Sequence, residues 1–264
     1  MSRALIAALV CLLVREAVAS GCPIPLEPTR TAFVTAVWIG DKGPFRFLFD
    51  TGATTTVIDR SLARSLGLQV TGTLAAVSTT GAVSVEESIV GEMRAGKIIL
   101  HHSPVLIAAL PRFPSHGDLD GILGMSFFAD HSVLIDVRRR CVEMGVAPPR
   151  GGVRVDARNV AGRVAIDIEG LSFVLDSGAS FPVLMSARAR SLAVQGEPMD
   201  VTSAAGRQRT RSATIPVLRI GRKTFRDVAV ALAPHTDPRE DGLLPVTAFE
   251  SVYIAGDREN VVIR

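Results

Sequence analysis

The sequence has little net charge and few aromatic residues, and each shortage excludes a class of protein. Its 264 residues include 29 Lys and Arg against 26 Asp and Glu, which gives a formal net charge of +3. A charge this small argues against a protein that binds a polyelectrolyte. Aromatic residues make up only 5% of the chain, and the basic residues are scattered along it rather than gathered into one stripe. Because a base-stacking surface needs both features, we expect no nucleic acid among the partners.

Cysteine is also scarce, with only Cys11, Cys22 and Cys141 present. Cys11 lies in the apolar run at the N-terminus, so two cysteines remain, and two are too few for a disulfide scaffold. Two alternatives stay open. Either Cys22 and Cys141 pair in an oxidising compartment, or Cys141 is a buried strand residue while Cys22 lies in a mobile N-terminal tail.

Long apolar runs are lacking outside the N-terminus, where Arg3 precedes an apolar run over residues 4–14. That run is too short for a transmembrane helix, which needs about 20 residues. It is followed by Ala17-Val18-Ala19, which has the small-x-small pattern of a signal peptidase site. We therefore predict that residues 1–19 are a removed signal peptide and that the mature protein is exported, either to the periplasm or as a secreted protein. In the alternative, Cys22 is the lipid-carrying first residue of a membrane lipoprotein.

The residues that are present favour a globular all-β protein. Hydrophobic residues make up 47% of the chain, and 23 Gly and 15 Pro punctuate it. Short segments that are rich in Val, Ile, Phe or Thr and bounded by Gly, Pro or Asp are typical of strands. Helical patterning is convincing only over 59–66 and 186–192, each opened by a capping residue. The predicted strands are Ala32–Ile39, Phe45–Phe49, Lys97–Leu100, Val133–Val137, Val164–Ile168, Ser172–Leu175, Thr214–Ile220, Val228–Leu232 and Val261–Ile263.

An internal repeat divides the mature chain into two halves. The segment Phe45–Thr54 lies over Leu171–Ser180, so that Asp50 corresponds to Asp176 at an offset of 126 residues. Four matched blocks in the same order indicate a duplicated lobe. The other three blocks are Arg64–Leu66 with Arg190–Leu192, Val77–Gly81 with Val201–Gly206, and Asp120–Gly124 with Asp241–Pro245.

A stretch rich in Pro and Gly marks the boundary between the two halves. Residues 147–152 read Ala-Pro-Pro-Arg-Gly-Gly, a composition that is typical of linkers. We therefore place the N-terminal lobe at residues 20–147 and the C-terminal lobe at residues 148–264.

In each lobe an apolar strand ends at Asp, a hydroxyl residue and Gly. A single such triplet would be ordinary turn chemistry, but duplication changes its meaning. If the lobes pack about a pseudo-twofold axis, Asp50 and Asp176 meet at that axis. Two adjacent carboxylates hold one proton between them. The ionised member can take a proton from a water that attacks a carbonyl, while the protonated member donates toward the carbonyl oxygen, so the chemistry requires neither a metal nor another cofactor.

The residues that follow each Asp have expected supporting roles. Thr51 and Ser177 should hydrogen-bond across the junction of the lobes and hold the two loops rigid. Gly52 and Gly178 should let the backbone turn closely beside the carboxylates.

These motifs resemble those of the aspartic peptidases, the family shared by pepsins and retroviral proteases. The carriers are Phe-Leu-Phe-Asp50-Thr-Gly-Ala-Thr, Phe-Val-Leu-Asp176-Ser-Gly-Ala-Ser, and Gly-Ile-Leu-Gly124 with its counterpart Gly-Leu-Leu-Pro245. The resemblance implies a bilobal all-β fold of two retropepsin-like lobes, a cleft for an extended peptide, and flap hairpins over it. The mature chain is short for a pepsin and is more similar to the bacterial single-chain retropepsin-like envelope proteases. The implied activity is that of a monomeric aspartic endopeptidase with Asp50 and Asp176 as its catalytic pair and a peptide or protein as its substrate.

Three departures from the family pattern matter. Pro245 stands where Gly124 stands in the first lobe, so the brace behind the second loop must differ. Both triplets are followed by Ala, at Ala53 and Ala179, where pepsins usually carry a hydroxyl residue. The loss of that donor should move the titration of the carboxylate pair toward neutral pH. The only Tyr of the chain, Tyr253, lies outside both candidate flaps, so the flap tyrosine of the pepsins is absent.

The candidate flaps are hairpins around Gly81 and Gly206, which we expect to lie over bound substrate. Three arginines, Arg207, Arg209 and Arg211, fall on the second flap. Either they select acidic side chains of the substrate, or they form an exposed basic hairpin.

Other motifs carry less weight. Gly91–Lys97 matches half of a phosphate loop, but Ile98 follows where Ser or Thr would hold magnesium. The five His residues show no metal-ligand spacing, and no Gly-x-Ser-x-Gly elbow of a serine hydrolase occurs. The main alternative to an endopeptidase is a non-catalytic envelope module, with or without a lipid anchor, that binds peptides on the same fold, and Pro245 is the residue that raises this alternative.

Overall fold

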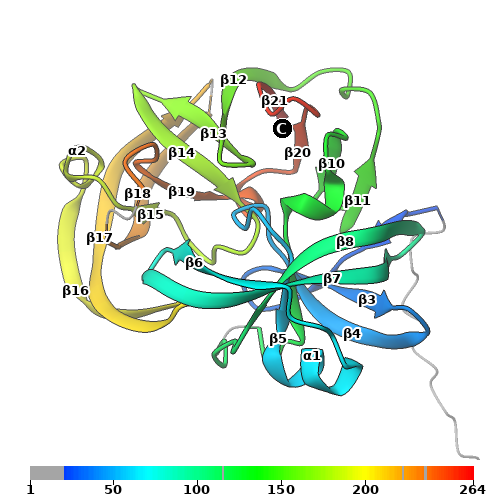
Figure 1. Cartoon of the computed structure of the whole chain (residues 1–264). Coiled ribbons are helices and arrows are strands. Elements are labelled where there is room, and N and C mark those ends of the chain that lie inside the picture. Colours follow the sequence, from blue (N-terminus) through cyan, green and yellow to red (C-terminus); the bar gives the residue numbers. More distant parts are fainter. Residues whose placement is uncertain (1–20, 115, 222, 235–236) are drawn as a thin grey trace, which may run out of the picture.

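The computed structural model describes residues 21–114, 116–221, 223–234 and 237–264, and the predicted signal peptide and Cys11 lie outside these ranges. Figure 1 shows two groups of strands, one blue to green and one light green to orange, with a further group of strands beside both. Strands make up most of the described chain, so the prediction of an all-β fold with two repeated lobes is confirmed. Among the described residues, no helix has the length and apolar character that a membrane crossing needs.

Lobe one is built on one sheet with a mixture of parallel and antiparallel pairs. A short helix, α1 (Arg60–Leu66), directly follows β5 (Val57–Asp59) along the chain and lies at the lower edge of the lobe in Figure 1. The order of strands across the sheet is β2 (Glu27–Pro28), β3 (Phe33–Ile39), β4 (Lys42–Phe49), β9 (Gly121–Leu123), β5 (Val57–Asp59), β8 (Ile98–Ala108), β7 (Gly81–Ala95) and β6 (Gly72–Ser78).

Lobe two repeats this order strand for strand, which confirms that the sequence repeat is a structural one. Its helix α2 (Ala187–Arg190) is shorter than the predicted 186–192, because Ser186 is the N-cap and the chain turns at Ser191. The order is β12 (Val153–Val160), β13 (Arg163–Ile168), β14 (Leu171–Asp176), β19 (Gly242–Pro245), β15 (Val183–Leu184), β18 (Lys223–Leu232), β17 (Gly206–Ile220) and β16 (Val194–Ser203).

A third group of strands joins the two lobes. Antiparallel pairs connect strands from both halves of the chain, and the first half of β12 closes the group while its second half enters lobe two. The predicted linker over 147–152 carries the chain between the two halves without helix or strand. Short 3-10 turns, η1 (Met125–Phe128) and η2 (Val246–Ala248), lead from each lobe into this group. The strands are β1 (Ile24–Pro25), β11 (Cys141–Met144), β10 (Val133–Asp136), β20 (Ser251–Ile254) and β21 (Asn260–Ile263).

A disulfide between Cys22 and Cys141 ties the start of the described chain to β11, with 5.8 Å between the two Cα atoms. Of the two alternatives that the sequence leaves open, the structure has the bridge. The alternative that places Cys22 in a mobile tail is wrong, because β1 pairs with β11 directly after it and leaves the residue only 6% exposed. A sulfur in this bridge cannot also carry a lipid, so the bridge and a lipid anchor at Cys22 exclude each other.

The core supports the ends of two equivalent strands. The last three residues of β4 and all six residues of β14 are buried, and they include Phe47, Phe49 and Phe173. The ring of Phe49 meets that of Phe128 edge to face, with 5.9 Å between their centroids. Each buried aromatic side chain of this kind stabilises the fold by about 2–3 kcal/mol. The loops that follow β4 and β14 therefore start from rigid supports.

Candidate active site

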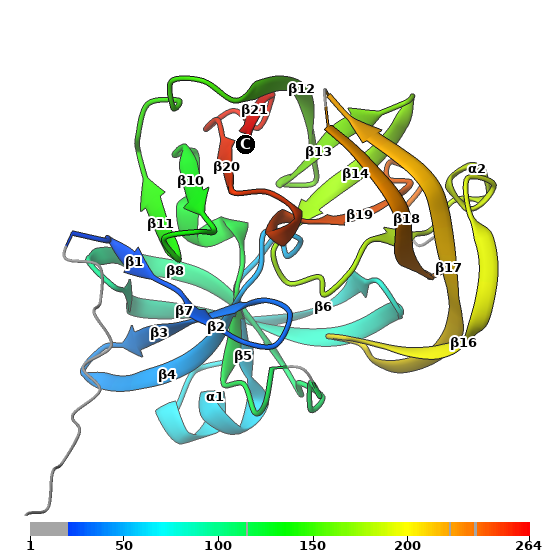
Figure 2. The ribbon, with the colours of Figure 1, turned by 180° about the vertical axis from the view of Figure 1, so that it is seen from behind.

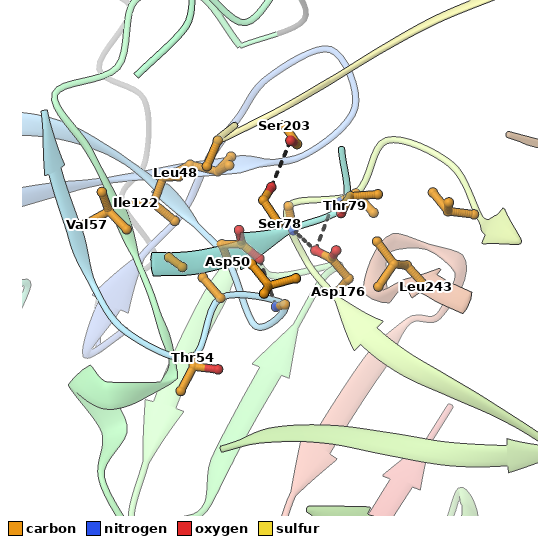
Figure 3. Close-up of a pocket in the computed structure, with 18 of the residues that line it drawn as sticks. Leu48, Asp50, Thr54, Val57, Ser78, Thr79, Ile122, Asp176, Ser203 and Leu243 are labelled. Carbon is orange, nitrogen blue, oxygen red and sulfur yellow. Dashed lines mark hydrogen bonds between the residues drawn. The ribbon is translucent and has the colours of Figure 1, made fainter. Parts of the chain in front are cut away.

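Asp50 and Asp176 stand where the central strands of the two lobes end. The backbone N–H of Asp50 donates to the carbonyl of Leu123, 3.1 Å away, as β4 runs parallel to β9. Asp176 pairs with Pro245 at the end of the equivalent parallel strands, β14 and β19. Figure 3 shows the two carboxylates close together on one side of a pocket, with Ser78 and Ser203 across from them.

Thr51 and Ser177 link the two loops through a closed set of hydrogen bonds. The Thr51 N–H donates to Ser177 Oγ at 2.9 Å, and the Ser177 N–H donates to Thr51 Oγ1 at 3.0 Å. Each hydroxyl then donates to a carbonyl of the other lobe, Thr51 to Leu175 at 2.7 Å and Ser177 to Phe49 at 2.8 Å. Both side chains are fully buried. The expected hydrogen bonds across the lobe junction are thus present, and they fix the two carboxylates relative to one another.

Gly52 and Gly178 are required by space rather than by backbone conformation, because neither adopts the left-handed conformation that favours glycine. A Cβ on Gly52 would lie 2.5 Å from Cγ of Asp176, and a Cβ on Gly178 would lie 2.8 Å from Cγ of Asp50. Real Cβ atoms do not come this close to other heavy atoms. Each glycine therefore makes room for the carboxylate of the opposite lobe, and the backbone passes close beside the carboxylates as expected.

The electrostatics of the pair are those of two carboxyls that share a proton. Burial raises the pKa of both groups, and that of Asp176 stands well above its ordinary value because the charge of Asp50 adds to the effect. The hydrogen bond between the two carboxyls and the N–H of Gly52 lower the pKa of Asp50 in part. The pair therefore holds one proton into a pH range where isolated carboxyls are ionised, and Asp176 binds it more strongly.

Two hairpins close over the carboxylates. Strands β6 and β7 join through Thr79 and Thr80, and strands β16 and β17 join through residues 204–205. Both views of the ribbon show the two hairpins reaching toward each other (Figures 1 and 2). Their tips are in contact, because Ser203 Oγ lies 2.8 Å from Ser78 Oγ and 2.6 Å from Thr80 Oγ1. The hairpins have the arrangement expected of flaps.

The flap glycines and the flap arginines differ from expectation in detail. Gly81 and Gly206 have φ of 138° and 114°, so they serve the hairpin turns, and other flap residues line the cleft. These residues are Ala76–Thr79, Val83, Val85 and Asp200–Ala204. The three arginines of the second flap alternate along the exposed face of β17, and Arg207 pairs with Asp200 at 2.5 Å. Among the described residues that line the cleft, none of these arginines occurs. The structure thus has the exposed basic hairpin rather than a substrate-selecting arginine set.

The cleft between flaps and carboxylates has a volume of about 800 Å³, and both lobes line it. Both walls carry apolar side chains, which are Leu48, Val57 and Ile122 from lobe one (Figure 3) and Phe181, Val183 and Leu243 from lobe two. The lobe-two wall also carries charge. Besides Asp176 and the flap residue Asp200, the charged residues there are Arg163, Asp237, Arg239 and Glu240.

A comparison with known families now decides what this arrangement is. The family model described as aspartyl protease matches residues 35–127 and 160–247, which fall in lobe one and lobe two respectively. The chain belongs to the aspartyl protease family. No curated protein matches the chain at a significant level. Membership of the aspartyl protease family supports a protease-type function, and the two matched segments are the two that end their central strands in Asp.

In this aspartyl protease, the hydrogen bond that braces the loop bearing Asp50 in lobe one has no equivalent behind the loop bearing Asp176 in lobe two. In lobe one, the N–H of Gly124 donates to Thr56 Oγ1 at 3.2 Å. Pro182 occupies the place of Thr56 in lobe two, because the carbonyl of each accepts from the strand beside it, at the N–H of Leu106 and of Ala231 respectively. Lobe two therefore lacks both the donor, at Pro245, and the acceptor, at Pro182. Because both are gone together, no polar group of this hydrogen bond is left buried and unpaired.

The parallel pairing of β14 with β19 is kept despite this change, and it runs through Asp176 and Pro245. The brace of lobe two differs, as predicted, but the carboxylate of Asp176 stands in the same relation to Gly52 as that of Asp50 to Gly178. Within the ranges that the structure describes, no group of three or more His, Cys, Asp or Glu side chains is arranged to hold a metal ion.

Proposed function

We propose that the chain is an aspartic endopeptidase that hydrolyses peptide bonds with a water molecule activated by Asp50 and Asp176. The observation that carries the proposal is the buried pair of hydrogen-bonded carboxyls, one from each lobe, in a cleft that both lobes and both flaps enclose. A cleft of this kind suits a peptide in extended conformation, because flap strands can pair with its backbone.

The reaction follows from the shared proton. Asp50, the more readily ionised member, takes a proton from the water, and the water oxygen forms a bond to the carbonyl carbon. Asp176 gives its proton to the carbonyl oxygen, so a neutral tetrahedral diol results. The C–N bond then breaks as the nitrogen receives the proton held by Asp50 and a diol hydroxyl returns its proton to Asp176. The pair ends in its starting protonation state, with one acid and one amine as products.

The test compares peptide cleavage by the mature protein, residues 20–264, with that by Asp50→Asn and Asp176→Asn. Each substitution keeps the size of the side chain but removes either the base or the acid, so we expect a loss of about 10²- to 10⁴-fold in kcat. Asp41→Asn is the matched control, since Asp41 is exposed at the turn between β3 and β4. Cleavage by the two site variants at the parental rate would overturn the proposal. Binding of peptides without cleavage by any of the proteins would identify the non-catalytic module instead.

We further propose that the protein is exported and acts as a monomer. Export is supported by the predicted signal peptide over residues 1–19 and by the Cys22–Cys141 bridge, because disulfides persist in oxidising compartments. Action as a monomer is supported by the presence of both carboxyls in one chain. The mass of the mature protein tests the export route. We expect the mass of a chain that starts at residue 20, with both cysteines resistant to alkylation. A mass increased by a lipid on Cys22 would contradict this expectation.

A further inference from the structure

The two walls of the cleft are built from equivalent positions, and the strand registers define the equivalence. Phe47 pairs with Gly121 in lobe one as Phe173 pairs with Gly242 in lobe two. The last residues before β9 and β19 also correspond, because the N–H of Asp120 donates to the carbonyl of Arg46 as that of Asp241 donates to the carbonyl of Ser172. Glu240 therefore occupies the place of Leu119. The remainder of this loop is four residues shorter in lobe two, so Asp237 has no assigned counterpart in lobe one.

A second position follows from the hairpins that precede the loops bearing Asp50 and Asp176. Val34 pairs with Leu48 in lobe one, and Ala165 pairs with Val174 in lobe two. Because Leu48 and Val174 are equivalent, Arg163 occupies the place of Ala32. At two equivalent positions, lobe two thus carries a charged residue where lobe one carries Ala or Leu.

In lobe two, Arg163 and Glu240 form one connected ionic group with Asp237 and Arg239. Nη1 of Arg163 lies 2.9 Å from Oε2 of Glu240, and Nη2 lies 3.5 Å from Oδ2 of Asp237. Asp237 in turn is held by Arg239 at 2.7 and 2.9 Å. The side chains of Arg163, Asp237 and Glu240 are 14%, 11% and 5% exposed, so the group forms part of the wall rather than of the outer surface.

In lobe one the same positions are without charge. Ala32 and Leu119 belong to an apolar cluster with Leu48 and Ile122. His116, which also lines this wall, lies 3.0 Å from Thr29 Oγ1, and burial together with the nearby Arg46 lowers its pKa, so it is neutral at physiological pH. The wall of lobe one therefore offers an apolar surface, whereas the wall of lobe two adds fixed donors and acceptors to its own apolar residues Phe181, Val183 and Leu243.

We infer that the two sides of the cleft select different substrate residues: a bulky apolar side chain against lobe one, and a neutral side chain with an amide or hydroxyl group against lobe two. This inference rests on the proposed function, because it concerns the residues on either side of the cleaved bond. An aliphatic side chain against lobe two would remove the ionic group from water and return no hydrogen bond. A charged side chain would compete with partners that the two guanidinium and two carboxylate groups already have. An amide both donates and accepts, so it fits between Arg163 and the carboxylates.

The first experiment is cleavage of a peptide library by the mature protein, with the products sequenced on both sides of the cut. We expect one side to show bulky apolar residues and the other to show Gln, Asn, Ser or Thr. We then compare matched peptides that differ only in the residue expected to face lobe two, which is Gln, Leu, Glu or Lys. The kcat/KM for the Gln peptide should be about tenfold higher than that for the Leu peptide, since Leu has nearly the same shape as Gln. The Glu and Lys peptides should also have a lower kcat/KM than the Gln peptide.

The decisive variant copies lobe one into lobe two, as Arg163→Ala combined with Glu240→Leu. Both partners of the Arg163–Glu240 ion pair leave together, and Asp237 keeps its ion pair with Arg239. We expect the preference to reverse toward Leu. Arg138→Ala with Glu250→Leu removes an exposed ion pair whose members do not line the cleft, and it should leave the preference unchanged.

The outcomes separate the inference from the proposed function. Cleavage with apolar residues on both sides, or a preference that the lobe-copying variant does not change, would overturn the inference while the proteolytic function stands. If no peptide is cleaved, the same Gln and Leu peptides are made uncleavable with a reduced amide and their binding is measured by calorimetry. A tenfold preference for Gln that the variant reverses would then support the inference without the proposed function, and equal binding would overturn it.

Discussion

The two lobes of this protein agree where they meet and differ where they face the cleft. Both end a buried central strand in Asp, a hydroxyl residue and Gly, and the same hydrogen bonds and the same glycine gaps occur in both directions across the junction. Behind and beside that junction, lobe two has replaced the Thr56–Gly124 brace and has gained an ionic group on its wall. Geometry at the axis is shared because each lobe completes the other, whereas each wall can change independently.

The glycine gaps give the largest expected effect. Gly52→Ala and Gly178→Ala would each push a methyl group into the carboxyl of the opposite lobe, at 2.5 and 2.8 Å. We expect each to lower kcat for peptide cleavage by about 100-fold, because a displacement near 1 Å in a catalytic group has about that consequence. If the lobes are equivalent at the axis, the two losses should be similar.

A control keeps this result interpretable. Gly91→Ala changes a glycine in β7 whose added Cβ would meet no atom within 4 Å, so it should leave kcat unchanged. Thermal denaturation of all three variants separates loss of activity from loss of fold. A loss confined to Gly52→Ala would show that only one carboxyl needs its exact position.

The hydrogen bonds across the junction give the next effect. Thr51→Val and Ser177→Ala each remove a hydroxyl that accepts one buried N–H and donates to one buried carbonyl. We expect each to lower the free energy of unfolding by about 1–3 kcal/mol, measured by urea denaturation. Thr55→Val is a comparison in the same loop, at a residue without such a bond across the junction. Values that differ widely between Thr51 and Ser177 would break the symmetry of the junction.

Substitutions at the two brace positions, Thr56 and Pro182, should lower the free energy of unfolding by different but smaller amounts. Thr56→Ala leaves the buried N–H of Gly124 without its side-chain acceptor and should lower the free energy of unfolding by about 1–2 kcal/mol. Pro182→Ala, at the equivalent position, removes no such acceptor and should change it by about 0.5 kcal/mol or less. Equal effects, measured by the same urea titration, would mean that the lobe-one hydrogen bond contributes nothing of its own.

The last effect is a dependence on pH. Because burial and Asp50 raise the pKa of Asp176 in the folded state, the folded protein binds more protons than the unfolded chain, and stability falls as pH rises above the ordinary value of 3.8 toward the raised pKa. Asp176→Asn removes this dependence. We therefore expect the variant to gain stability relative to the parent at pH 7 and to show no gain near pH 3, by denaturation at each pH.

Asp237 should behave in the opposite way. Its hydrogen bond with Arg239 lowers its pKa from 3.8 to about 2, so its contribution is present above 3.8 and is lost as pH falls toward 2. Asp237→Asn should then lower stability at pH 7 and have no effect near pH 2. Asp176 at the axis and Asp237 on the wall would thus differ in the sign of the stability change that substitution by Asn causes at pH 7.

Much of the fold was predictable because it depends on local pattern. The predicted strands all fall on strands, and the Asp59 side chain caps α1 by accepting from the N–H of Ser61, as its position suggests. The flap strands were predicted too short or missed, because β6, β16 and the first halves of β7 and β17 have few or no buried residues and so lack a buried apolar face. The wall residues Arg163, Asp237 and Glu240 were missed as well, since no local motif contains them.

The sequence by itself determined that this chain has two copies of one lobe, that each copy ends a buried strand in Asp, and that the lobes are to be combined within one chain. Those properties are readable because they lie in residue identity and spacing. The tertiary structure decided that Cys22 pairs with Cys141, that the flaps meet at Ser203, that Gly52 and Gly178 make room for carboxyls, and that Arg163 lies beside Glu240. Each of these depends on strand register and lobe packing, which bring together residues that are far apart along the chain.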